Sequence, residues 1–150
     1  MNKVTIYTDG ACRQNSTWQG GWGVVILNEN GGIKAKLNGS EENTTNSRME
    51  IQAVIEGLKY LTEPSEVKII SDSAYVCNTI NGWLDMWQRK GILREKANVD
   101  QWLQFIELRK IHRVTAKHIR GHHGIYYNEI CDSLATGAIR GEYVKGEHNE

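Results

Sequence analysis

The stretch KVTIYTDG, residues 3–10, decides how the fold is interpreted. It is short, rich in β-branched and aromatic residues, and ends in Asp-Gly, so it predicts a β-strand with Asp9 at its C-terminal end. A second stretch, VKIIS at residues 67–71, has the same character and is followed directly by Asp72. If these strands are parallel neighbours, both carboxylates emerge at one edge of the sheet, where open α/β sheets bind ligands.

The segments around these two strands predict a mixed sheet with helices packed on it. The turn Asn30-Gly31-Gly32 separates two strands, at residues 20–28 and 33–37, as in a β-hairpin. Helical spacing of apolar residues predicts helices at 47–61, at 73–87 with a break near Gly82, at 99–110 and at 128–139, and residues 114–119 predict a fifth strand. The order predicts an α/β fold: a five-stranded mixed sheet, strands 1–3 antiparallel and strands 1, 4 and 5 parallel, with helices on both faces.

Length and composition predict one folded domain. The 150 residues are 39% hydrophobic and 24% charged, which is ordinary for a globular protein. We expect residues 1–145 to form this domain and residues 146–150 to form a flexible tail. The formal net charge is zero, so any contact with nucleic acid must depend on local patches of charge.

Cysteine usage and the lack of targeting signals predict the compartment. Cys12, Cys77 and Cys131 are odd in number and form no CxxC pair, which is typical of reduced thiols. The first residues contain no apolar targeting segment, and no run approaches the length that spans a membrane. We therefore expect a cytoplasmic protein that does not bind membranes.

Two more carboxylates, Glu50 and Asp132, lie in the first turns of predicted helices and can join Asp9 and Asp72. Mg²⁺ prefers clustered carboxylate oxygens, and four carboxylates suit two ions. Two ions about 3.5–4 Å apart clamp the attacking and leaving oxygens of a phosphodiester. The residues alone leave other roles open, namely a turn at Asp9, a capping box from Ser47 to Glu50, a helix N-cap at Asp72 and a surface acid at Asp132.

Four segments resemble ribonuclease H of type 1, in the order and at the separations of that family. They are YTDGAC around Asp9, TTNSRMEIQAVIEGL around Glu50, ISDSAYV at Asp72, and RGHHGIYYNEICDSLA from Arg120 to Ala135. The resemblance implies an endonuclease that cuts the RNA strand of an RNA–DNA hybrid and leaves 3′-hydroxyl and 5′-phosphate ends. It also implies a two-metal-ion mechanism, with Mg²⁺ as the cofactor and Mn²⁺ as a substitute.

The same resemblance implies roles for individual residues. Asp9, Glu50, Asp72 and Asp132 would be the catalytic metal ligands. His122 would assist proton transfer or product departure, since it matches the family position and its neighbour His123 does not. An imidazole suits this role because its ordinary pKa lies in the working range.

Substrate contacts are also implied by the resemblance. Short polar groups near RNA 2′-hydroxyls would be Asn15, Asn46, Ser47 and the backbone at Cys12. Thr45 and Asn98 would bind a DNA phosphate, and a basic protrusion would contact phosphates through Trp83, Trp87, Arg89 and Lys90. The alternatives are turn and cap roles for Asn15 and Asn46 and core packing for the two tryptophans.

The sequence departs from the family at two places that bear on substrate binding. Asn43 stands where the family often has an arginine, which puts the strength of the phosphate pocket in question. Residues 16–19 replace the family's Pro-Gly turn, and Trp18 within them is either a substrate contact or part of the loop packing.

Rival interpretations remain open at this stage. A zinc site from His118, His122, His123 and Cys131 lacks any standard spacing. A nuclease of the same fold that cuts DNA junctions, a hybrid-binding module without catalysis and a fragment of a reverse transcriptase are the other candidates. Since all four carboxylates are present, we expect a catalytically active monomer that acts on RNA–DNA hybrids.

Overall fold

A six-stranded mixed sheet forms the centre of the computed structural model, which describes residues 1–13, 17–120, 125–144 and 146–147. The strand order is β5-β4-β1-β2-β3-β6. The central strand β1 pairs antiparallel with β2 and parallel with β4, and β5 is parallel to β4. The five predicted strands and their directions are therefore confirmed. The strands are β1 Asn2–Cys12, β2 Gly20–Leu27, β3 Ile33–Glu41, β4 Ser65–Ser71, β5 Arg113–His118 and β6 Gly146–Glu147.

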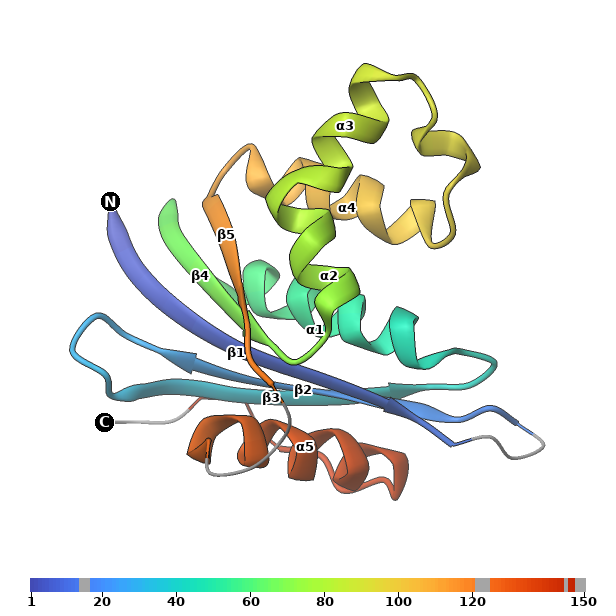
Figure 1. Ribbon diagram of the computed structural model, residues 1–150. Coiled ribbons are helices and arrows are strands. Elements are labelled where there is room, and N and C mark those ends of the chain that lie inside the picture. The colour runs from blue at the N-terminus through green and yellow to red at the C-terminus, as the bar shows by residue number, and fades with distance from the viewer. Residues whose placement is uncertain (14–16, 121–124, 145, 148–150) are drawn as a thin grey trace.

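Helices cover both faces of the sheet, as the sequence predicts. Figure 1 shows α1 and α4 on one side and α5 alone on the other. The predicted helix over residues 73–87 is in fact two short α-helices joined by a π-helical turn, η1, which contains Gly82. The helical elements are α1 Asn46–Tyr60, α2 Ala74–Asn78, η1 Thr79–Trp83, α3 Leu84–Arg89, the 3₁₀ turn η2 Leu93–Glu95, α4 Val99–Arg109 and α5 Tyr126–Ile139.

A sixth strand of two residues, β6, extends the predicted five-stranded sheet at the edge formed by β3. Gly146 pairs with Lys36 and Glu147 with Ala35 of β3. Both residues belong to the segment 146–150, which we predicted to be a flexible tail, and their pairing with β3 differs from that prediction. Gly-Glu carries no strand pattern, and two residues cannot show an alternation.

The hydrophobic core lies between the sheet and the helices α1 and α4. Alternate residues of β1, such as Val4 and Ile6, point toward this core and are 7% and 0% exposed. Trp102 and Phe105 of α4 are both fully buried in the same cluster. This packing fixes β1 and α1 against each other, and both carry residues of the candidate site.

The described residues contain no helix with the length and apolar character needed to cross a membrane.

Candidate metal centre and substrate surface

Asp9 lies inside a continuous strand. β1 runs on to Cys12, and Asp9 is the partner of Gly23 in β2, so the interpretation of Asp9-Gly10 as a plain turn is wrong. The residue is only 3% exposed. The Gly10 N–H donates a hydrogen bond of 2.9 Å to Asp9 Oδ1, which orients the carboxylate.

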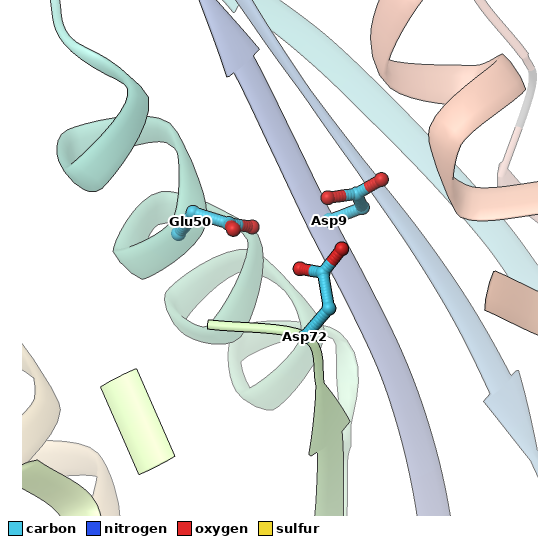
Figure 2. Close-up of side chains that lie close together, drawn as sticks. All are labelled: Asp9, Glu50 and Asp72. Carbon is cyan, nitrogen blue, oxygen red and sulfur yellow. The ribbon is translucent and has the colours of Figure 1, made fainter. Parts of the chain in front are cut away.

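Glu50 lies in the first turns of α1, but it does not cap that helix. The N-cap is Thr45, whose Oγ1 accepts a hydrogen bond of 3.1 Å from the Arg48 N–H. The alternative of a capping box between Ser47 and Glu50 is therefore wrong, because the N-cap lies two residues before Ser47 and the helix begins at Asn46. The Glu50 side chain points toward Asp9 on β1 (Figure 2).

Asp72 follows the last residue of β4. The N-cap of the next helix is its neighbour Ser73, whose hydroxyl accepts a hydrogen bond of 3.2 Å from the Val76 N–H. The N-cap interpretation of Asp72 is therefore wrong. Its carboxylate points instead toward Asp9 and Glu50, and its backbone carbonyl lies 3.2 Å from His118 Nε2.

These three carboxylates converge on one point from β1, α1 and the end of β4 (Figure 2). One oxygen from each of Asp9, Glu50 and Asp72 lies within 4.8 Å of the others. Burial and the nearby negative charges of Asp9 and Asp72 raise the pKa of Glu50 well above its usual value. The strand pattern predicted that Asp9 and Asp72 lie at the same edge of the sheet, and Glu50 joins them from α1.

A divalent cation fits this group of residues. Glu50 Oε1 is buried and has no hydrogen-bond partner among the described residues, which is costly for a carboxylate oxygen. A bound cation would satisfy that oxygen and offset the repulsion between the three acids. The donors are all hard carboxylate oxygens, which is the set that Mg²⁺ prefers.

Asp132 is not part of this group of three. It lies on α5 and is exposed, while the preceding residue, Cys131, faces the sheet. One residue corresponds to about 100° around a helix, so Asp132 cannot point in the same direction as Cys131. Its role as a metal ligand stays a prediction.

The zinc site receives no support from the described residues. The Cys131 thiol is fully buried and donates to the Tyr7 carbonyl oxygen, 3.2 Å away. Burial raises its pKa well above the usual value, so the thiol stays protonated and is a poor zinc ligand. His122 and His123 lie outside the described residues.

Gly10 is the point where α1 crosses β1 most closely. A Cβ at this position would collide with the backbone of Met49 and Glu50. We expect Gly10→Ala to lower the free energy of unfolding by about 3 kcal/mol, the upper part of the range for overpacking against a rigid neighbour. It should also reduce activity, because α1 carries Glu50 away from Asp9. Urea denaturation and a cleavage assay measure the two effects.

Gly82→Ala is the matched control for stability, since a Cβ there meets no atom within 4 Å. Equal stability of the two variants would show that the close approach at Gly10 is not required.

Thr45 and Asn98, the predicted phosphate pocket, are linked by one arginine. Arg48 Nη1 donates to Asn98 Oδ1 at 3.3 Å, and the Arg48 backbone N–H donates to Thr45 Oγ1 as described above. The guanidinium also forms two hydrogen bonds with Asp100, at 3.0 and 2.7 Å. We did not predict this pair from the sequence, although Arg48 stands inside the quoted segment around Glu50. The Arg48 guanidinium brings a cation to the predicted phosphate pocket, where Asn43 stands in place of the arginine often found in the family.

Both Asn98 and Asn43 adopt left-handed backbone conformations, with φ of 63° and 53°. Asparagine tolerates this region better than most residues do. Both polar atoms of the Asn98 side chain are hydrogen-bonded. Its Oδ1 accepts from Arg48, and its Nδ2 donates to Tyr75 Oη at 3.2 Å.

Three of the predicted RNA contacts, Asn46, Ser47 and Cys12, lie within three or four residues of Asp9 or Glu50 in the chain. Asn46 and Ser47 are exposed in the first turn of α1. Cys12 is half-buried at the end of β1, and its thiol lies 3.4 Å from the carbonyl oxygens of Trp18 and Thr44. Asn15 lies outside the described residues.

The two tryptophans of the predicted protrusion differ in exposure. Trp83 is 41% exposed, whereas Trp87 is 7% exposed and belongs to the core. The Lys96 ammonium lies 5.1 Å from the centre of the Trp87 ring. Packing is therefore the observed role of Trp87, and Trp83 is the ring available to a ligand. Arg89 and Lys90, at the end of α3, are both exposed.

Trp18 has a left-handed backbone, with φ of 48°, and its side chain is 47% exposed. Its backbone carbonyl accepts a hydrogen bond of 3.2 Å from the Thr44 N–H. The loop is thus held through the Trp18 backbone, and about half of the side chain faces solvent.

Comparisons with known proteins agree on one family. The family model of RNase H matches residues 1–140. The ribonuclease H of Caldicellulosiruptor saccharolyticus is 43% identical over 145 residues, which cover 93% of this chain and 98% of that protein.

Solved structures show the same fold. LC9-RNase H1, a type 1 RNase H with the type 2 active-site motif, is 27% identical with a TM-score of 0.86, covering 100% of this chain and 78% of that one. LC11-RNase H1 in complex with an RNA/DNA hybrid is 23% identical with a TM-score of 0.69, covering 92% of this chain and 97% of that one. The chain belongs to the ribonuclease H family.

Proposed function

We propose that this protein is a metal-dependent endonuclease that hydrolyses the RNA strand of RNA–DNA hybrids and leaves 3′-hydroxyl and 5′-phosphate ends. Family membership supports the reaction class. The observation that carries the chemistry is the convergence of Asp9, Glu50 and Asp72 within 4.8 Å, with one buried oxygen of Glu50 unpartnered.

Asp9, Glu50 and Asp72 would hold Mg²⁺, with Mn²⁺ as a substitute, and Asp132 would join them at a second ion. Mg²⁺ supplies Lewis-acid chemistry, since it neutralises the phosphodiester and lowers the pKa of bound water. The chain's own contribution is rigidity. Asp9 is fixed within the central strand of the sheet, and the close contact at Gly10 fixes Glu50 beside it.

Recognition of the hybrid would use the surfaces on either side of the carboxylates. Asn15, Asn46, Ser47 and the backbone at Cys12 would contact 2′-hydroxyls, which distinguish RNA from DNA. Thr45 and Asn98 would bind a phosphate of the DNA strand, with the Arg48 guanidinium beside them. Trp83, Arg89 and Lys90 would contact the backbone further along the hybrid. The solved complex of LC11-RNase H1 with a hybrid supports this class of substrate.

We further propose that residues 1–145, together with strand β6 that pairs with β3, act as one domain, as a monomer and in the cytoplasm. The support is the chain's length and the absence of paired cysteines among Cys12, Cys77 and Cys131. Size-exclusion chromatography with light scattering measures the oligomeric state, and a dimer would contradict this part of the proposal.

A cleavage assay on four labelled substrates tests the proposed function. The substrates are an RNA–DNA hybrid, duplex DNA, duplex RNA and a four-way DNA junction of the same sequence, each with and without Mg²⁺. We expect cleavage of the RNA strand of the hybrid alone, and only with the metal. Preferred cleavage of the junction would instead identify a nuclease of another type on the same fold.

A further inference from the structure

Asn81 makes an unusual contact with the edge of the sheet. Its side-chain Nδ2 donates to the Ala116 carbonyl oxygen at 2.8 Å, and the Ala116 N–H donates to Asn81 Oδ1 at 2.9 Å. β5 is the edge strand on this side, so Ala116 has no further strand to pair with. One amide side chain therefore satisfies both backbone groups of Ala116, as a residue of a neighbouring strand would.

The π-helical turn η1 carries Asn81. The Leu84 N–H bonds to the Thr79 carbonyl oxygen, five residues earlier, where an α-helix would use a partner four residues earlier. Such turns are rare and often mark functional positions. η1 also lies where the helical pattern of the sequence breaks, near Gly82.

Asn81 joins two parts of the proposed site that are far apart in the sequence. Trp83, the exposed ring of the protrusion, follows two residues later, and α3 continues from there to Arg89. On the other side, Ala116 precedes His118 by two residues, and His118 contacts the backbone of Asp72. Figure 1 shows β5 beside the column formed by α2 and α3.

The strand is also tied to the carboxylate edge by its backbone. The Ile119 N–H donates to the Ser71 carbonyl oxygen at 2.9 Å, immediately before Asp72. A short series of contacts therefore connects η1, which leads into the protrusion, with the backbone at Asp72, a proposed metal ligand. It passes through Asn81 and Ala116. Among the described side chains of η1, that of Asn81 hydrogen-bonds to β5 through both its amide nitrogen and its amide oxygen.

We infer that Asn81 is a positioning residue that sets the protrusion at a fixed distance from the carboxylates, and so sets which phosphate of the hybrid is cut. The inference rests on the proposed function, because it requires the protrusion to contact the hybrid. Asn81 itself touches neither metal nor scissile phosphate. Its effect is exerted through the placement of Trp83 and α3.

The test uses Asn81→Ala and the nearly isosteric Asn81→Asp, with Asn78→Ala as the control. Asn78 is an exposed asparagine three residues earlier, and its side chain makes no capping hydrogen bond. The substrate is a single hybrid of fixed sequence with end-labelled RNA, so that KM, kcat and the positions of the cuts are measured together.

We expect both Asn81 variants to raise KM about two- to tenfold, with a smaller change in kcat. An effect of this size corresponds to the net contribution of one hydrogen bond, and Asn81→Ala loses two, of which only a part affects hybrid binding. The distribution of cuts along the RNA should also shift. Asn81→Asp should be no milder than Asn81→Ala, because its carboxylate repels the Ala116 carbonyl oxygen. Asn78→Ala should keep the wild-type KM and cut positions. In a Trp83→Ala background, Asn81→Ala should add little further increase in KM.

A purely structural role predicts a different result. If Asn81 only shields the edge of β5 from pairing with other chains, Asn81→Ala will change the melting temperature or association state but leave KM and the cut positions unchanged. That result overturns the inference. If instead the wild-type protein does not cut the hybrid at all, the proposed function fails, which is a separate and distinguishable outcome.

Discussion

Asp9→Asn is expected to abolish cleavage of the hybrid. The substitution keeps the shape of the side chain but removes a negative charge from the centre of the three-carboxylate group, where Asp9 is 3% exposed. Without that charge the site loses affinity for divalent cations, so the loss should exceed the roughly 10⁴-fold that general acid–base assistance supplies. Single-turnover cleavage with saturating enzyme and millimolar Mg²⁺ measures it.

Binding of the hybrid should survive the same substitution, because Asp9 holds metal rather than phosphate. Removal of a negative charge that faces a polyanion can even tighten binding. Glu66→Gln is the control, since Glu66 is an exposed acid on β4, remote from the carboxylate group. Near-normal turnover by Asp9→Asn would show that the metal site is assigned to the wrong residues.

His122→Ala is expected to leave a slow but measurable nuclease. A group that passes protons or eases product release typically contributes about 10²–10⁴-fold, which is less than a central metal ligand contributes. We therefore expect a large drop in kcat with little change in KM. This prediction comes from the sequence alone, because residues 121–124 lie outside the described structure.

His123→Ala is the matched control for His122, because the two residues have the same chemistry and are adjacent. The expected result is a small change in kcat at His123. If both variants behave alike, or if His123→Ala is the more damaging, His122 is the wrong choice.

The three central carboxylates could be predicted because each follows from a local pattern. Asp9 follows the apolar stretch of β1 and Asp72 follows β4, and the predicted parallel pairing of those strands brings the two residues to the same edge. Glu50 was harder to place, since a capping box explains the same spacing. The choice between the two roles depends on where α1 begins, and helix ends are uncertain by a residue or two from sequence alone.

Features that depend on tertiary contacts could not be predicted. Trp83 and Trp87 share a helical spacing, but only the packing against the core decides which of them is buried. The π turn at η1 carries Asn81, which contacts Ala116, 35 residues away in the chain. The ion pair between Arg48 and Asp100 likewise joins residues 52 positions apart.

The most direct test of the metal centre is calorimetric titration of the wild-type protein with Mg²⁺ in two buffers of different ionisation enthalpy. The raised pKa of Glu50 favours its protonated form in the metal-free fold, so this contribution to stability is present at low pH and is lost as the pH rises through that pKa. Metal and proton therefore compete for the same carboxylate. The account predicts that Mg²⁺ binds with proton release, more strongly as the pH rises, and raises the melting temperature, whereas Asp9→Asn should show greatly weakened binding. If millimolar Mg²⁺ gives neither heat of binding nor a change in melting temperature with the wild-type protein, the three carboxylates do not form a metal site.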